Sequence, residues 1–123
     1  MAKSTLHLAL KRAYEEAMLE DGKRILVDRL WPRGLSRERA QLDLWLKEIA
    51  PSDELRRWFG HDPAKFAEFR QRYEAELASE TAQKALEQIR TLAKEGRTTL
   101  VFAAHDQEHS NAVVLRDVLF HMQ

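Results

Sequence analysis

The chain lacks cysteine altogether, and its 123 residues include only three prolines and four glycines. Without cysteine there is no disulfide, no thiolate nucleophile and no zinc site with cysteine ligands, and a cytoplasmic location is the simplest expectation. The chain also lacks net charge, because 20 Lys and Arg residues balance 20 Asp and Glu residues. No overall positive potential therefore attracts a nucleic acid, so only a local basic patch could do so.

Long apolar runs are missing as well. Nowhere do 18 apolar residues follow one another, so the sequence predicts no membrane span. The apolar stretch from Leu6 to Leu10 ends at Lys11, too early for the core of a signal peptide, which again favours the cytoplasm. A hydrophobic content of 44% in 123 residues predicts one globular domain over residues 1–123.

Three stretches have the composition of β-strands. In Thr5–Arg12, leucines alternate with other residues, which is typical of a strand with one buried face. Ile25–Val27 and Thr98–Ala104 are unbroken β-prone runs, as in central strands buried on both faces. Between the first two strands, residues 13–20 are rich in helix formers, and both a helix and an irregular segment stay open there.

Helical patterns dominate the rest of the chain. Ser36 is a plausible N-cap, and the apolar spacing of Leu42, Trp45, Leu46 and Ile49 predicts a helix that ends before Pro51. The further predicted helices begin at Ser52 and at Asp62-Pro63, span Thr81–Glu95, and close the chain from Val114 to Met122.

Helices between apolar strands make those strands parallel. The predicted fold class is therefore α/β: a single-domain, three-layer α/β/α arrangement with a small, mainly parallel central sheet. Such sheets bind ligands beyond the carboxyl ends of their strands. Polar segments follow two of the strands there, at residues 28–34 and 105–111, so we expect Asp28 and His105 at the same edge of the sheet.

The first polar segment contributes Asp28, Arg29, Trp31 and Arg33 as candidates. Arg29 and Arg33 can grip a carboxylate or phosphate through their planar guanidinium groups, with Asp28 orienting one of them or acting as a base. Trp31 could form an aromatic wall for a ring. The alternative is structural: Asp28 and Arg29 form an ion pair that braces the loop, and Trp31 belongs to the core.

The second polar segment contributes His105, Asp106, His109, Ser110 and Asn111. His105 is the best general acid or base, and Ser110 or Asn111 could cap the final helix, whose first amides would form an anion site. Imidazole and carboxylate groups also suit a metal, but their spacing matches no established metal motif, so no metal and no cofactor is predicted. His61, in a Gly-His-Asp-Pro turn, is more typical of a loop residue that helps to cap the next helix, although a turn beside the sheet edge could also bring it to the cleft.

Four segments resemble the DUF488 family, in its YeaO-like branch: Arg24–Gly34 (RILVDRLWPRG), Ala50–Leu55 (APSDEL), Trp58–Pro63 (WFGHDP) and the loop at 103–112. The resemblance spans about residues 24–119, whereas the first twenty residues fit it less well. It implies a three-layer α/β fold with an Asp-Arg pair after a central strand. Many relatives carry Cys-His-Arg at the start of the final helix, where this chain has Glu108-His109-Ser110-Asn111. Thiol chemistry in those relatives therefore does not transfer to this chain.

These features together predict a protein that binds an anionic small molecule, a nucleotide or a sugar phosphate, at the strand tips. Catalysis on that molecule is left open, with Asp28 and His105 as the candidate catalytic residues. The alternative is a regulatory module that contacts nucleic acid or protein through the same basic and aromatic patch. A nucleic acid is the weaker expectation because the chain has no net positive charge. The sequence carries no indication of an oligomeric state.

Overall fold

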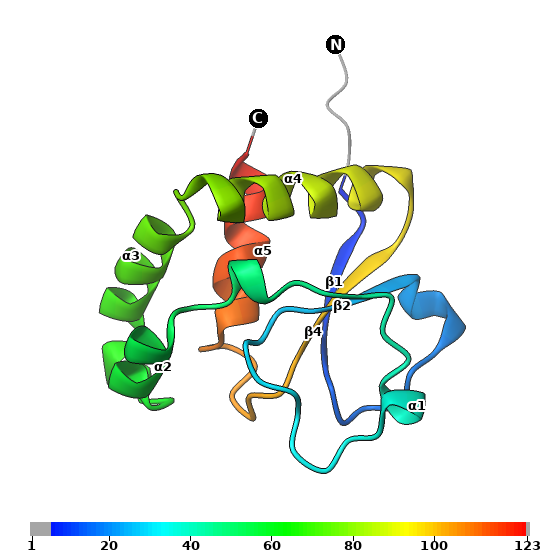
Figure 1. Cartoon of the computed structure of the whole chain (residues 1–123), viewed down its shortest axis with the longest axis horizontal. Helices are drawn as coiled ribbons and strands as arrows, with labels where there is room; N and C mark the ends of the chain where they lie inside the picture. Colours follow the sequence, from blue (N-terminus) through cyan, green and yellow to red (C-terminus); the bar gives the residue numbers. More distant parts are fainter. Residues whose placement is uncertain (1–5, 123) are drawn as a thin grey trace.

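The computed structural model describes residues 6–122 and contains a four-stranded sheet (Figure 1). Its strands are β1 (Leu8–Arg12), β2 (Lys23–Leu26), β3 (Leu44–Trp45) and β4 (Thr98–Phe102), in the spatial order β1-β4-β2-β3. Every pair of neighbouring strands is parallel. The predicted α/β class is thus confirmed, as a parallel sheet flanked by helices. The predicted start of the first strand, Thr5, lies outside the described residues.

The α-helices are α1 (Arg37–Ala40), α2 (Asp53–Phe59), α3 (Phe66–Glu76), α4 (Glu80–Glu95) and α5 (Asn111–His121), and short 3-10 turns occur at Leu19–Asp21, Lys47–Ile49 and Pro63–Lys65. Two predicted caps are confirmed: Ser52 Oγ accepts a hydrogen bond from Leu55 N–H at 3.1 Å, and Asp62 Oδ1 accepts one from Ala64 N–H at 3.0 Å. Such caps satisfy amide groups that a helix start leaves without a partner. No helix within residues 6–122 is long and apolar enough to cross a membrane.

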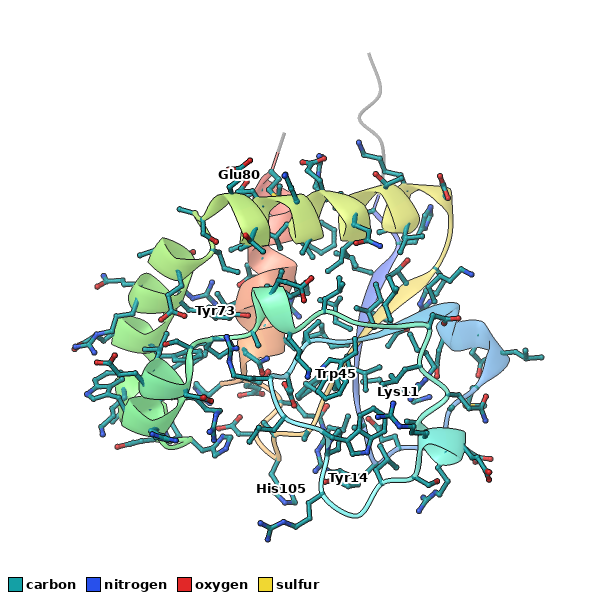
Figure 2. The ribbon with its side chains drawn as sticks, viewed as in Figure 1. Lys11, Tyr14, Trp45, Tyr73, Glu80 and His105 are labelled. Atoms are coloured by element: carbon teal, nitrogen blue, oxygen red, sulfur yellow. The ribbon has the colours of Figure 1, made fainter. Side chains whose placement is uncertain are left out.

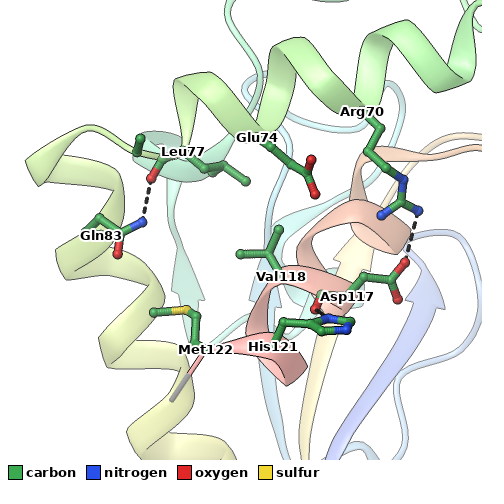
Figure 3. Close-up of a pocket in the computed structure, with 9 residues that line it drawn as sticks. Arg70, Glu74, Leu77, Gln83, Asp117, Val118, His121 and Met122 are labelled. Carbon is green, nitrogen blue, oxygen red and sulfur yellow. Dashed lines mark hydrogen bonds and ion pairs between the residues drawn. The ribbon is translucent and has the colours of Figure 1, made fainter.

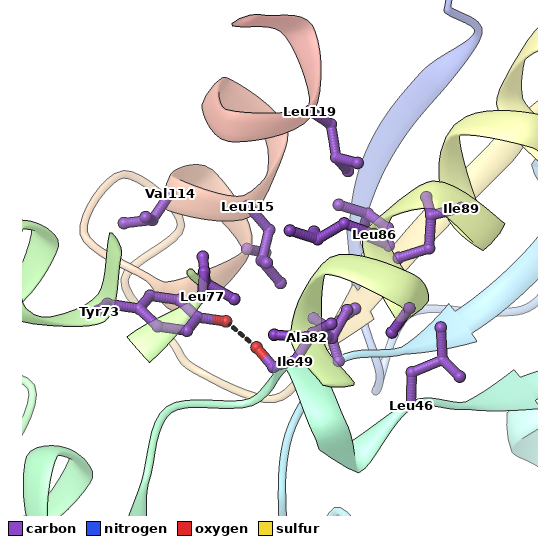
Figure 4. Close-up of a cluster of buried hydrophobic side chains, with 14 of the residues drawn as sticks. Leu46, Ile49, Tyr73, Leu77, Ala82, Leu86, Ile89, Val114, Leu115 and Leu119 are labelled. Atoms are coloured by element: carbon purple, nitrogen blue, oxygen red, sulfur yellow. Dashed lines mark hydrogen bonds between the residues drawn. The ribbon is translucent and has the colours of Figure 1, made fainter. Parts of the chain in front are cut away.

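The larger core contains residues of the sheet and of α2 to α5, and of these helices α4 and α5 pack directly against the strands (Figure 1). Ile25 and Leu100 extend into it from the strands, and Leu86 and Leu115 meet them from the helices; all four are fully buried. Figure 4 shows part of this cluster. Burial of each such side chain is worth about 1.5–3 kcal/mol, so this core holds the helices against the sheet.

The opposite face of the sheet has a smaller core built around Leu26 and Val101. Trp31 and Trp45 pack against it, with their ring centroids 5.4 Å apart in an edge-to-face arrangement. This face is covered by the one-turn helix α1 and by the irregular connection from β2 to β3. The connection is therefore held against the sheet just beyond the end of β2.

The long helix predicted after Ser36 is wrong. Ser36 Oγ does accept a hydrogen bond from Arg39 N–H at 3.1 Å, but α1 ends after one turn at Gln41, whose φ is 45°. That left-handed conformation is uncommon outside glycine and turns the chain out of the helix.

The apolar spacing that predicted this helix serves two different cores. Leu44 pairs with Ile25 of β2, so the segment becomes the edge strand β3. Trp45 packs against the smaller core, whereas its neighbour Leu46 is buried in the larger one. Opposite faces for successive residues are a property of strands, so strand pairing decides against the helical spacing.

The open segment at 13–20 forms no α-helix and ends in the 3-10 turn Leu19–Asp21. The Asp21 carboxylate, 6% exposed, accepts hydrogen bonds from Lys11 Nζ at 3.1 Å, Arg24 Nη1 at 2.8 Å and Met18 N–H at 2.9 Å. Burial alone would raise the pKa of Asp21, but these three donors outweigh it and hold the pKa below its usual value. The carboxylate thereby joins β1 to β2.

Candidate functional site

A cleft of about 540 Å³ lies beyond the carboxyl ends of β2 and β4. We call it the strand-tip cleft; its walls are residues 28–33, 103–106 and 110–111, together with Tyr14, Pro51, Arg56, Phe59, His61 and Phe69. Leu26 and Val101 pair in parallel, as expected, which brings the two polar segments to one edge of the sheet. His105 and Tyr14, both labelled in Figure 2, lie at this end of the molecule.

All predicted site residues except His109 line the strand-tip cleft, namely Asp28, Arg29, Trp31, Arg33, His105, Asp106, Ser110 and Asn111. The His109 ring packs edge-on against Phe66, with ring centroids 5.2 Å apart. The structure therefore brings the candidates together, and their roles toward a ligand stay predictions.

Asp28 connects three elements at the strand-tip cleft. Its Oδ2 accepts a hydrogen bond from Ala103 N–H after β4 at 2.9 Å, and its Oδ1 accepts one from Asn111 Nδ2 in α5 at 3.0 Å. Burial raises the pKa of Asp28 above its usual value, and these hydrogen bonds and the nearby His61 offset that effect only in part. The carboxylate is thus held by the fold in a poorly solvated place.

The alternative of an Asp28–Arg29 ion pair is wrong. Arg29 Nε donates to the Pro51 carbonyl at 3.1 Å, and its Nη2 donates to the Ala50 carbonyl at 3.4 Å. Within residues 6–122, the Arg29 guanidinium lies within ion-pair distance of no carboxylate. A guanidinium has five N–H donors, so Arg29 braces the segment before α2 and keeps donors for a ligand.

Two more arginines line the strand-tip cleft. Arg33 is exposed, and its carbonyl accepts a hydrogen bond from the Tyr14 hydroxyl at 2.9 Å, while its guanidinium has no ion-pair partner among residues 6–122. Arg56 forms a loose ion pair with Asp53 at 3.4 Å, and its buried Nε has no hydrogen-bond partner among the described residues. Guanidinium groups therefore dominate the charge of this surface.

Trp31 belongs to the smaller core, as its structural alternative expected, and its role as a wall for a ligand ring stays a prediction. Its Nε1 donates to the Leu35 carbonyl at 2.6 Å, and its ring packs against Trp45 of the smaller core. The same residue lines the strand-tip cleft. The hydrogen bond fixes the indole, so the ring is a rigid part of the wall.

Ser110 stands at the N-cap position of α5, yet its side chain caps no amide group of the helix. The residue is 1% exposed, and its Oγ has no hydrogen-bond partner among the described residues. Asn111, the other candidate cap, donates instead to Asp28 and to the Val27 carbonyl. A buried hydroxyl without a partner costs about 1–3 kcal/mol, so Ser110 is an unused polar group in the wall of the cleft.

Asp106 and His109 form a local turn. Asp106 Oδ1 accepts hydrogen bonds from the N–H groups of Glu108 and His109, and its Oδ2 lies 2.8 Å from His109 Nδ1. The hydrogen bond with the His109 ring is the main reason that the pKa of Asp106 lies below its usual value.

In the part of the chain that the structure describes, no three His, Asp or Glu side chains are grouped to hold a metal ion. The absence of a metal stays a prediction. Metal analysis of protein purified without an affinity tag tests it, and we expect no stoichiometric zinc or iron.

The sequence favours a capping role for His61 over a place in the cleft, and it does not directly predict the aromatic wall beside it. His61 has a φ of 59°, and this left-handed conformation follows that of Gly60, so the chain turns sharply after α2 and His61 lines the cleft. Phe59 and Phe69 are buried and stacked with centroids 4.2 Å apart, and they also line the cleft. The WFGHDP segment was the available indication, because it places a histidine directly after two aromatic residues and a glycine.

A second cavity, of about 480 Å³, lies between α3, α4 and α5 (Figure 3). Its basic and amide side chains already have partners: Arg70 pairs with Asp117 at 2.9 Å, Gln83 Nε2 donates to the Leu77 carbonyl at 2.8 Å, and His121 Nδ1 lies 2.7 Å from the Asp117 carbonyl. The strand-tip cleft, which keeps unpaired donors, is therefore the better candidate site.

Comparisons with known proteins agree with the family resemblance of the sequence. The model of the family described as "Inactive DUF488-N3 subclade" matches residues 7–122 and thus includes the N-terminal segment that resembled the family less. "Uncharacterized protein YeaO" of Escherichia coli (strain K12) is 41% identical over 114 residues, which cover 93% of this chain and 97% of that protein. "Uncharacterized protein Rv3073c" of Mycobacterium tuberculosis (strain ATCC 25618 / H37Rv) is 40% identical over 108 residues, which cover 88% of this chain and 89% of that protein. No solved structure matches the chain. The chain belongs to the DUF488 family, in the subclade that is described as inactive.

Proposed function

We propose that this protein binds an anionic small molecule, a nucleotide or a sugar phosphate, in the strand-tip cleft. The proposal rests on the observation that Arg29 and Arg33 both line the cleft and have no ion-pair partner among residues 6–122. A planar guanidinium matches the geometry of a phosphate or carboxylate and binds it through two parallel hydrogen bonds.

The charge balance of the cleft supports an anion. Arg29, Arg33 and Arg56 contribute three positive groups, against the carboxylates of Asp28 and Asp106. Opposite unit charges 4 Å apart attract by about 1 kcal/mol in water and by about 4 kcal/mol near a protein surface. A phosphate at the arginine side of the cleft gains from more than one such interaction.

We propose binding without turnover. The matching family model is described as an inactive subclade. The chain also has no cysteine, so it lacks the thiol group that many relatives carry at the start of the final helix. Asp28, one of the two catalytic candidates, uses both carboxylate oxygens to hold Ala103 and Asn111. In this proposal the carboxylate positions the start of α5, and His105 contacts the ligand at the exposed edge of the cleft.

A ligand series on the purified protein tests the proposal. Ribose 5-phosphate, AMP and GMP are compared with ribose and adenosine by thermal shift and calorimetry. A ligand at 100 times its Kd stabilises the folded state by about 2.7 kcal/mol, which is readily measured. We expect stabilisation by the phosphates alone, and no response to any of them would refute the proposal. Binding of a single-stranded oligonucleotide that weakens steeply with salt would favour the alternative, a nucleic-acid-binding module.

A further inference from the structure

Two polar groups in the wall of the strand-tip cleft have hydrogen-bonding capacity that the fold does not use. Asp28 accepts one hydrogen bond on each carboxylate oxygen, and each oxygen can accept two. The Ser110 hydroxyl, in a residue that is 1% exposed, has no partner among residues 6–122. Both residues line the strand-tip cleft, and Asn111, which follows Ser110, donates to Asp28 at 3.0 Å.

The surroundings of these groups suit a flat ring. Phe59 and Phe69 are stacked with centroids 4.2 Å apart and line the same cleft, as do Pro32 and Pro51. Aromatic and proline side chains offer apolar surface of the kind that buries a planar heterocycle, while a few polar groups fix its orientation. The arginines of the proposed anion site lie in the same cleft.

We propose that the strand-tip cleft recognises a guanine-type base of a nucleotide, with Asp28 accepting hydrogen bonds from the imino and amino N–H groups and Ser110 Oγ donating to the ring carbonyl. The inference rests on the proposed function and names the class of anion that the site takes. Each polar group of the nucleotide has a complementary group in the cleft. The two adjacent N–H donors of the base face the Asp28 carboxylate, its carbonyl faces the Ser110 hydroxyl, and the phosphate faces Arg29 and Arg33.

The same groups discriminate against other nucleotides. Adenine has a ring nitrogen acceptor where guanine has the imino donor, so its lone pair would face the Asp28 carboxylate. A site built to pair a particular hydrogen-bonding edge rejects analogues that lack it, because its buried polar groups are then left without partners. Burial also raises the pKa of Asp28, which means that the carboxylate is poorly solvated and gains from additional donors. A sugar phosphate without a base engages the arginines only.

Calorimetry on the intact chain with GMP, IMP, AMP and ribose 5-phosphate tests the inference. IMP keeps the imino group and the carbonyl but lacks the amino group, so we expect it to bind about tenfold more weakly than GMP. AMP and ribose 5-phosphate should be weaker by about a hundredfold or more.

Variants separate recognition of the base from folding. Ser110→Ala removes a hydroxyl that has no partner in the fold, so its melting temperature should match or exceed that of the parent, while GMP affinity falls about tenfold and ribose 5-phosphate affinity is unchanged. Asp28→Asn should prefer XMP to GMP, because an amide offers one acceptor and one donor to the ring. Asp117→Asn, a carboxylate-to-amide change near the other end of α5, is the matched control and should bind GMP like the parent.

Each result decides between the two proposals. Equal affinities for GMP and AMP, or a Ser110→Ala variant that binds GMP as tightly as the parent, overturn the guanine inference. If ribose 5-phosphate still binds in that case, the proposed anion site stands. If none of the four compounds binds, both proposals fail. Should Asp28→Asn not fold, the ligand series and Ser110→Ala still decide the question.

Discussion

Replacing Arg29 by lysine should weaken anion binding strongly at a small cost in stability, and the structure sets the size of both effects. Arg29 donates to the carbonyls of Pro51 and Ala50, at 3.1 and 3.4 Å. A hydrogen bond from a charged group contributes about 1.5–3 kcal/mol, and a distance of 3.4 Å is beyond the usual range for a strong bond. Lysine keeps the charge and can replace one donor, so we expect the free energy of unfolding to fall by about 1 kcal/mol.

The effect on binding should be larger. Lysine cannot make two parallel hydrogen bonds to one phosphate, so the variant loses about 1.5–3 kcal/mol of binding free energy, or roughly tenfold to a hundredfold in affinity. Arg33→Lys provides the comparison, because the Arg33 side chain is exposed and donates no hydrogen bond within residues 6–122. That variant should lose affinity with no change in stability.

Urea denaturation and calorimetry with ribose 5-phosphate measure the two quantities separately. For a chain of this length, a loss of 1 kcal/mol lowers the melting temperature by about 3–5 °C. Arg72→Lys, at an exposed arginine of α3 that pairs with Glu68, controls for the general effect of such a change. If Arg29→Lys melts far earlier than this and the parent responds to no anion, Arg29 is a structural brace and the reasoning fails.

The remaining predictions concern buried groups around the sheet, and urea denaturation checks each of them. Gly22→Ala should lower the free energy of unfolding by at least about 2 kcal/mol, because Gly22 has a φ of 66° and a Cβ there would lie 2.0 Å from the Arg97 carbonyl oxygen. A variant as stable as the parent would contradict this prediction. Asp21→Asn should cost about 3–5 kcal/mol, since it leaves the buried Arg24 guanidinium without its carboxylate, and a loss below 1 kcal/mol would show that Arg24 is solvated instead. The pKa of Asp28 is higher in the folded than in the unfolded chain, so its stabilising contribution is present below pH 3.8 and is lost as the pH rises from there through the folded pKa. Asp28→Asn should abolish that fall relative to the parent, and parallel pH profiles of the two proteins would refute it. The lowered pKa of Asp21 acts in the opposite direction, with stability that is lost as the pH falls below 3.8.

Features that depend only on residues close together in the chain could be predicted before the fold was known. Ser52 and Asp62 cap helices because a short polar side chain reaches the amides two or three residues further on. β4 could be recognised because an unbroken run of β-prone residues, fully buried in the structure, has few other places in a fold. Once parallel strands were expected, the rule that ligands bind beyond their carboxyl ends placed the polar segments after β2 and β4 at one cleft.

The partners that individual residues take depend instead on contacts between distant segments of the chain. Leu44 belongs to a strand because it pairs with Ile25, a contact between segments that no local spacing reveals. Arg29 turns to the carbonyl of Pro51 instead of Asp28, and Asn111 takes Asp28 and so leaves Ser110 without a partner. Each of these outcomes is a competition between groups far apart in the chain for a limited number of donors and acceptors. The outcome depends on where the packed core positions the backbone, and that position cannot be derived from the order of the residues alone.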